Sequence, residues 1–210
     1  MSDVILHDFW RSTAAYRVRI ALNLKGIAYR AVPIDLGQGE NLRDDYFSLN
    51  PQGLVPTLQI DGHILTQSLA IIDYLDATHQ YPPMVSSEPL RRSRTLAQAL
   101  TIAADIHPVN NLRILNALRS DFGASEEQVR LWVQRWIAAG FAALEESAPE
   151  TGLFGGATPD LADVCLVGQM YNARRFELDL APYPRLVRID AAARALDPVA
   201  RAAPEAVNPG

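Results

Sequence analysis

The sequence predicts an α/β domain followed by an all-helical domain, and three observations support this. In the first 80 residues, short apolar runs typical of strands alternate with segments of helical apolar periodicity. Residues 81–89 hold three prolines and two serines, which is the composition of a linker. Beyond residue 90, apolar side chains recur at helical spacing. We therefore predict an α/β domain over residues 1–82, a linker over 83–89 and an all-helical domain over 90–210.

The first domain begins with a predicted strand over residues 4–9 and a helix over 14–25. Gly26 follows the apolar face of that helix and is a typical helix terminator. A second strand is predicted over residues 28–34. Residues 41–49 are short and polar, and we expect them to be irregular or helical.

A β-hairpin and a third helix complete this domain. Pro56 opens a strand over residues 56–60, and its place after a loop containing a proline and a glycine favours a cis peptide bond. Asp61-Gly62 predicts a two-residue turn into a strand over 63–66. A helix over 68–79 follows. The order βαβ-α-ββα is that of a thioredoxin-like domain.

The second domain is predicted to contain three main helices. The first runs over residues 90–116 and is interrupted or bent at Pro108. The second runs over 125–146 and begins with the capping box Ser125…Gln128. The third begins at residues 160–163, where an aspartate cap is followed three residues later by another acidic residue. We expect the active cleft between the two domains.

Composition excludes several classes of protein. The formal charge of −5 over 210 residues argues against a nucleic-acid partner. No apolar run approaches the length of a membrane span, and the first residues lack the character of a signal peptide, so we expect a cytoplasmic protein. The single cysteine, Cys165, lies in an apolar run, which predicts a buried thiol rather than a nucleophile or a metal ligand. We predict no metal site.

Two predicted helix N-termini carry candidate functional residues. Ser12 and Thr13 lie at the start of the first helix, where the helix dipole and a hydroxyl would stabilise a thiolate, although either residue could be only a cap. Gln67 and Ser68 lie at the start of the third helix, where free N–H groups favour a carboxylate. The backbone of Val55 would pair with an extended peptide as an added strand. A small, anionic, peptide-like ligand fits this arrangement.

The whole chain resembles the zeta class of the cytosolic glutathione transferases. The resemblance is carried by long strings of residues, over 11–22 (Arg-Ser-Thr followed by Arg-Val-Arg-Ile-Ala-Leu), 50–58, 67–75, 105–113 and 172–184. One departure is informative. The family often has Ser-Ser-Cys where this chain has Ser12-Thr13-Ala14, so no protein thiol is available there and the thiol of glutathione must be the nucleophile.

The resemblance implies glutathione as the cofactor and a homodimer as the assembly. It implies catalytic roles for Ser12 and Thr13, with Ser12 hydrogen-bonded to the glutathione sulfur. The residues that it implies in glutathione binding are Ser12, Thr13, Asn41, Val55, Gln67, Ser68, His107, Asn111, Leu112 and Arg113. Because a keto-diacid substrate needs cations for its carboxylates, Arg11, Arg113 and Arg175 are the expected substrate-binding residues.

The function implied is a glutathione-dependent cis–trans isomerase that converts maleylacetoacetate to fumarylacetoacetate in tyrosine and phenylalanine catabolism. One alternative is the isomerisation of maleylpyruvate in gentisate-type aromatic degradation. Ala15, Tyr16 and residues 172–176 favour the first substrate. Two further alternatives are a broad glutathione-conjugating transferase and a non-catalytic binding protein. Loss of Ser12 or of Gln67-Ser68 would have favoured the binding protein, and all three residues are present.

Overall fold

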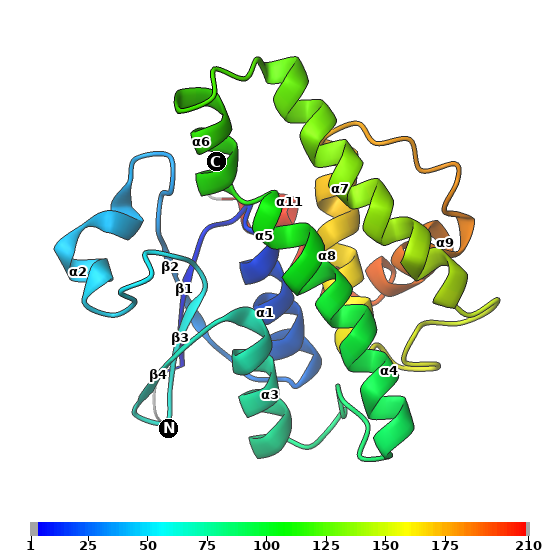
Figure 1. The fold of residues 1–210 in the computed structure, drawn as a ribbon. Helices are drawn as coiled ribbons and strands as arrows, with labels where there is room; N and C mark the ends of the chain where they lie inside the picture. Colours follow the sequence, from blue (N-terminus) through cyan, green and yellow to red (C-terminus); the bar gives the residue numbers. More distant parts are fainter. Residues whose placement is uncertain (1–3, 209–210) are drawn as a thin grey trace. The chain divides into compact units, whose positions relative to one another are not determined.

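The computed structural model describes residues 4–208 of the chain, which divide into two compact units (Figure 1). Unit 1 runs to Pro83 and also takes in the segment from Ala195 onward, and unit 2 is Met84–Arg194. The predicted fold class, an α/β thioredoxin-like domain with an all-helical domain, is confirmed.

Unit 1 is built on a four-stranded mixed sheet. Its strands are β1 (Ile5–Asp8), β2 (Arg30–Pro33), β3 (Thr57–Ile60) and β4 (His63–Thr66). The strand order is β2-β1-β3-β4, with β1 and β2 parallel and the other pairs antiparallel. Its helices are α1 (Thr13–Leu24), the short η1 (Glu40–Leu42) and α2 (Asp44–Phe47), and α3 (Ser68–Thr78). In Figure 1, α1 and α3 lie on one side of the sheet and α2 on the other.

The local signals around the hairpin are confirmed. The Val55–Pro56 bond is cis, as predicted, and a second cis bond, Tyr81–Pro82, is present that the sequence analysis did not anticipate. Asp61 and Gly62 have φ angles of 51° and 77°, the left-handed pair that a type I′ turn requires.

The segment from Ala195 onward packs with unit 1, although the sequence placed it with the second domain. It contains α10 (Asp197–Ala200) and α11 (Pro204–Val207). The Nε–H of Arg19 on α1 donates to the carbonyl of Ala202 at 2.9 Å, and the Nδ2–H of Asn23 donates to the carbonyl of Pro198 at 2.9 Å. These long-range bonds explain the difference, because helical periodicity carries no information about which unit a terminal helix joins.

Unit 2 is helical throughout its regular structure. Its elements are α4 (Pro89–Leu100), the π-helical η2 (Thr101–Ile106), α5 (His107–Val109), α6 (Leu112–Ser120), α7 (Glu126–Ser147), α8 (Leu161–Arg175) and α9 (Pro184–Arg194). The helix predicted over 90–116, with an interruption or bend at Pro108, is corrected to four consecutive elements, and an interruption follows Pro108 as expected.

The break in that predicted helix falls at Asn110–Asn111, shortly after Pro108. Proline lacks the N–H that a helix interior uses, and the π-helical turn comes directly before it. The N–H of Asn110 closes on the carbonyl of His107, three residues back, at 3.1 Å. Asn111 is then extended and accepts the N–H of Ile114 on its Oδ1 at 3.2 Å, so it caps α6.

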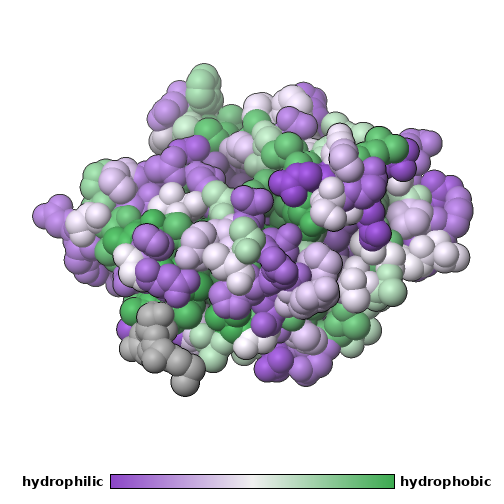
Figure 2. Space-filling model, turned by 90° about the horizontal axis from the view of Figure 1, so that it is seen from below, coloured by the Kyte–Doolittle hydropathy of each residue, from purple (hydrophilic) through white to green (hydrophobic). Residues whose placement is uncertain are grey.

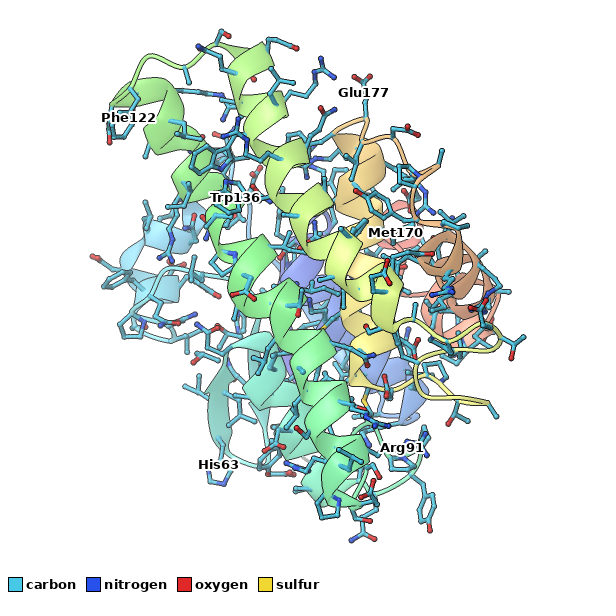
Figure 3. The ribbon with its side chains drawn as sticks, turned by 45° about the vertical axis from the view of Figure 1, so that its right-hand side comes forward. His63, Arg91, Phe122, Trp136, Met170 and Glu177 are labelled. Carbon is cyan, nitrogen blue, oxygen red and sulfur yellow. The ribbon has the colours of Figure 1, made fainter. Side chains whose placement is uncertain are left out.

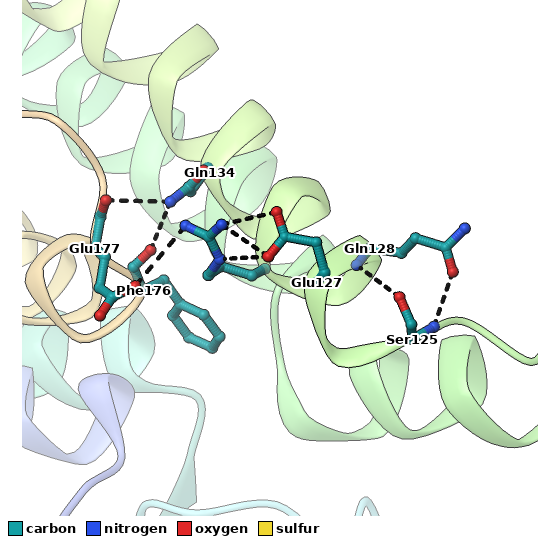
Figure 4. Close-up of polar contacts among 7 residues, drawn as sticks. Ser125, Glu127, Gln128, Gln134, Phe176 and Glu177 are labelled. Atoms are coloured by element: carbon teal, nitrogen blue, oxygen red, sulfur yellow. Dashed lines mark hydrogen bonds and ion pairs between the residues drawn. The ribbon is translucent and has the colours of Figure 1, made fainter.

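Both predicted capping boxes are confirmed. At α7, the Oγ of Ser125 accepts the N–H of Gln128 while the N–H of Ser125 donates to the Gln128 side chain (Figure 4). At α8, Asp160 and Asp163 form the equivalent pair. The buried carboxylate of Asp163 also accepts the N–H groups of Phe154 and Gly155, both at 2.9 Å, so it joins the preceding loop to the helix start.

Gly155 lies where that loop has no room for a side chain. A Cβ there would lie 2.2 Å from the Thr158 carbonyl oxygen and 2.7 Å from the Asp160 nitrogen, both backbone atoms. We expect Gly155→Ala to lower the free energy of unfolding by about 1–3 kcal/mol, measured by urea denaturation, because the loop must shift. Gly37→Ala, in an exposed loop of unit 1, is the control and should be close to neutral. Equal stability of the two variants would contradict this packing.

The surface and the core separate side chains as expected for a globular chain. On the face drawn in Figure 2, hydrophilic residues are interspersed with smaller hydrophobic patches. In Figure 3, Phe122 projects from the end of α6 and is 80% exposed, whereas Met170 on α8 is fully buried. Cys165 is buried on the same helix, as predicted. Within residues 4–208 no helix has the length and apolar character needed to cross a bilayer. The same residues hold no cluster of acidic, histidine and cysteine side chains suited to a metal ion.

Candidate active site

Ser12 is the N-cap of α1. Its φ and ψ of −70° and 120° are extended, and its Oγ accepts the N–H of Ala15 at 3.2 Å. A hydroxyl that accepts in this way keeps its own proton for donation to another group. Thr13 is the first residue of the helix and is buried. Ser12 therefore caps the helix, and the same geometry leaves a donor at the positive end of α1.

The loop that carries Ser12 is held by a buried ion pair. The Nη1 of Arg19 lies 2.7 Å from both carboxylate oxygens of Asp8 at the end of β1, and its Nη2 donates to the carbonyl of Trp10 at 3.0 Å. Burial raises the pKa of Asp8, and the Arg19 guanidinium opposes that shift. Arg11, the next residue, is exposed, with its guanidinium carbon 5.1 Å from the centre of the Trp10 ring. The buried Arg19 thus holds the loop from the interior of unit 1, while Arg11 faces solvent.

The loop before Val55 is braced from the α2 side. The carbonyl of Leu54 accepts from the Tyr46 hydroxyl at 2.5 Å and from the Asn50 side chain at 2.7 Å. The Nδ2 of Asn41 donates to the carbonyl of Gly53 at 2.7 Å. The structure therefore gives Asn41 a supporting role in this loop, and its predicted contact with the cofactor remains a prediction.

Gln67 and Ser68 begin α3. Gln67 has a φ of 67°, unusual for a residue with a side chain, and it makes no side-chain cap bond to the helix within the described chain. Its Nε2 donates instead to the Oε1 of Gln52 at 2.8 Å. Ser68 is buried, and its Oγ accepts from the Nη1 of Arg17 at 3.3 Å. The first-turn N–H groups of α3 are thus without a side-chain cap from Gln67, which suits a carboxylate ligand.

Arg17 is the functional candidate that the sequence analysis missed. It lies on α1, five residues after Ser12, and its side chain reaches Ser68 at the N-terminus of α3. The available signal was its position in the sequence. Arg17 lies between residues of the predicted helix that the apolar periodicity assigns to the core, where an arginine is unusual.

The predicted residues of unit 2 lie around the break between α5 and α6. His107 begins α5, Asn111 caps α6, and Leu112 and Arg113 are the first two residues of α6, both exposed. Asn110 is buried at the break. These polar residues therefore gather at the junction between two helices and not along a continuous helix.

Arg175 is the last residue of α8 and is exposed, with its guanidinium carbon 4.7 Å from the centre of the Phe176 ring. The Nε2 of Gln134 on α7 donates to the carbonyls of Phe176 and Glu177, at 2.8 and 3.1 Å, and so fixes this helix end (Figure 4). The neighbouring Arg174 instead pairs with the buried Asp190 at 2.5 Å. The two adjacent arginines therefore have different surroundings.

Comparison with known proteins agrees with this arrangement. Residues 11–78 match the family model described as the N-terminal domain of glutathione S-transferase. A maleylacetoacetate isomerase of Rhizobium meliloti is 46% identical over 211 residues, covering 99% of each chain. A holo structure of maleylpyruvate isomerase, a bacterial zeta-class glutathione S-transferase, is 44% identical with a TM-score of 0.95, covering 98% of this chain and 99% of that one. A maleylacetoacetate isomerase of Methylobacterium extorquens, solved with bound malonate and glutathione, is 39% identical with a TM-score of 0.92 and covers 96% and 97%.

Proposed function

Because the chain belongs to the zeta class of the glutathione S-transferase family, we propose that it is a glutathione-dependent isomerase that converts maleylacetoacetate to fumarylacetoacetate. The observation that carries the proposal is the pair of helix N-termini in unit 1: Ser12 caps α1, and Ser68 begins α3, where Arg17 of α1 reaches it. One supplies a hydroxyl donor for a thiolate, and the other supplies N–H donors for a carboxylate.

The residues present fit glutathione, which carries one thiol and two carboxylates. Ser12, with Thr13 beside it, would hold the sulfur. Gln67 and Ser68 would hold a carboxylate, since the N–H groups that begin α3 have no cap from the Gln67 side chain. The remaining candidate contacts are Asn41, Val55, His107, Asn111, Leu112 and Arg113.

Glutathione, when bound, would supply a thiolate for addition to the cis double bond, so that the resulting single bond can rotate before elimination of the thiolate restores the double bond in the trans form. Ser12 would lower the pKa of that thiol by donating a hydrogen bond from its hydroxyl to the sulfur, and the positive N-terminus of α1 would stabilise the thiolate further. The arginines bind the substrate carboxylates and stabilise the negative charge that develops on its oxygen. Arg11, Arg113 and Arg175 are the proposed residues for this role.

We expect Arg175→Ala to raise the KM for the keto-diacid by about 10-fold or more, because a charge-assisted hydrogen bond to a carboxylate is lost. Glutathione affinity should change little. Steady-state kinetics at varied substrate and at varied glutathione separate the two effects. Arg174→Ala is the matched control: it should lower the melting temperature, because the buried Asp190 keeps only the longer contact to Arg194 at 3.8 Å, with KM unchanged. A large loss of glutathione affinity in Arg175→Ala would reassign this residue to the cofactor.

Maleylpyruvate is the second candidate substrate, favoured by the TM-score of 0.95 to a maleylpyruvate isomerase. The test is isomerisation of both compounds, side by side, with and without glutathione. Glutathione-dependent preference for maleylacetoacetate supports the proposal, and the opposite preference moves the enzyme to gentisate-type degradation. Turnover of neither compound, with glutathione still bound, would leave a conjugating transferase or a binding protein.

The proposal includes a homodimer in the cytoplasm that binds neither nucleic acid nor membrane. The family resemblance supports the dimer, and the formal charge of −5 supports the absence of a nucleic-acid partner. Sedimentation of the purified protein tests the dimer directly.

A further inference from the structure

Arg17 is a buried cation inside unit 1. Its side chain is on α1 and the residue is only 2% exposed. An arginine cannot lose its charge by deprotonation in a protein, so its burial has to be compensated by specific contacts. Packing alone therefore does not account for the buried position of Arg17.

The two buried arginines of α1 point to different parts of unit 1. They are two residues apart, which separates their directions by about 200° around the helix. Arg19 pairs with Asp8 and donates to backbone carbonyls of Trp10 and Ala202, which explains it as a structural residue. Arg17 reaches α3, where its Nη1 donates to the Oγ of Ser68 at 3.3 Å.

That hydrogen bond determines what the Ser68 hydroxyl can do. A hydroxyl has one proton and accepts on its oxygen, so a Ser68 oxygen that accepts from Arg17 directs its proton elsewhere. Accepting from a cation also polarises the O–H bond and strengthens it as a donor. Ser68 is the first residue of α3, so its proton is available at the helix end whose N–H groups favour an anion.

The backbone beside Ser68 is constrained in the same place. Gln67 holds a φ of 67° and a ψ of 115°, a conformation that costs energy for a residue with a Cβ. Such strain is maintained where the surroundings fix the backbone, and Arg17 fixes the adjacent residue from α1.

We infer that Arg17 is a positioning residue of the glutathione site, which orients the Ser68 hydroxyl as a donor to one carboxylate of glutathione. The inference rests on the proposed function. Helix α1 then has two roles. Ser12 donates to the sulfur of glutathione, and Arg17, about one and a half turns further along, orients the Ser68 hydroxyl toward the carboxylate.

The test is equilibrium binding, by titration calorimetry, of three ligands to the full chain. These are glutathione, 4-aminobutanoyl-cysteinylglycine, which lacks the γ-glutamyl carboxylate, and γ-glutamyl-cysteinyl-glycinamide, which lacks the charge of the glycyl carboxylate. The variants are Arg17→Met, Ser68→Ala and the double variant. Arg201→Met is the control, because Arg201 is an exposed arginine of the same unit, paired with Asp197.

We expect Arg17→Met to weaken glutathione about tenfold and Arg201→Met to leave it unchanged. One analogue should bind the wild type and Arg17→Met alike, and that analogue identifies the carboxylate held at α3. The double variant should bind no worse than Ser68→Ala, since Arg17 acts through Ser68. The pH dependence of kcat, which reports the thiol at Ser12, should not move. Should the methionine variant unfold, Arg17→Lys keeps the charge and should show the same ligand pattern with a smaller loss.

Three results would overturn the inference: unchanged glutathione affinity in Arg17→Met, equal losses for all three ligands, or additive losses in the double variant. A wild type that binds none of the three ligands would instead remove the proposed function itself. The two failures are therefore distinguishable.

Discussion

Replacing Ser12 with alanine is expected to lower kcat/KM for isomerisation by about 10²-fold while glutathione affinity falls far less. Loss of a preorganised donor to a developing anion has effects of about 10²–10³-fold in other enzymes. The Ser12 hydroxyl keeps its proton for the sulfur because its oxygen already accepts the N–H of Ala15. Without that donor the pKa of the bound thiol rises, so the acidic limb of the pH–rate profile should move to higher pH.

The second role of Ser12, as the cap of α1, has to be separated from its chemistry. Alanine at an N-cap costs about 1 kcal/mol of stability, whereas glycine costs only a few tenths. Ser12→Gly should therefore lose activity like Ser12→Ala but keep nearly all of the stability, and Ser12→Thr should retain both. Equal losses in turnover and in glutathione affinity would show that Ser12 serves folding and binding and not the thiolate.

Replacing Asp163 with alanine is expected to reduce the free energy of unfolding by roughly 3–5 kcal/mol, because each orphaned buried donor costs about 1–3 kcal/mol. The carboxylate accepts three backbone N–H groups, from Phe154, Gly155 and Asp160, at 2.9 to 3.0 Å. Asp163 is fully buried, so water does not reach these donors without local opening. Urea denaturation measures the change, and Asp179→Ala, at an exposed turn, is the control.

The same residue gives the chain a pH-dependent stability. Burial, together with the charge of Asp160, raises the pKa of Asp163 to about 7 from its ordinary 3.8. The folded state then binds a proton that the unfolded chain releases, so this contribution to stability is complete below about pH 4 and is lost as the pH rises to about 7. Asp163→Asn should lack that slope, so the difference in unfolding free energy between wild type and this variant should change with pH between about pH 4 and 7. An unchanged slope in the asparagine variant would assign it to other groups.

Local chemistry made most of the fold predictable. Pro56 after a glycine-containing loop, the Asp61-Gly62 turn and the Asp160 and Ser125 caps each depend on residues within a few positions, and each was confirmed. The interruption near Pro108 was predicted, but not that the chain would leave the helix at Asn110 and start a new one after Asn111, because the apolar period continues through this segment. Pro108 weakens the helix there, and the Asn111 side chain then caps the new helix α6.

The candidate residues at the two helix starts could be chosen from the sequence, whereas the residues that hold them in place were harder to predict. Ser12 and Ser68 could be chosen because a hydroxyl at a helix start has a known electrostatic setting. The supports depend on contacts between distant segments: Arg17 reaches Ser68 across 51 positions, and Asn41 reaches Gly53 across a loop. The spacing of residues along one helix does not predict which distant residues such side chains will reach.

The bond from Arg19 to Ala202 spans 183 positions, and it has a consequence for synthesis of the chain. A ribosome makes all of unit 2 before it makes the segment that contributes this carbonyl to unit 1. The sheet of unit 1 is therefore made before unit 2, and the segment from Ala195 onward that completes unit 1 is made after it. The guanidinium of Arg19, which holds the loop carrying Ser12, therefore obtains its partner at Ala202 only after the helices of unit 2 have been made.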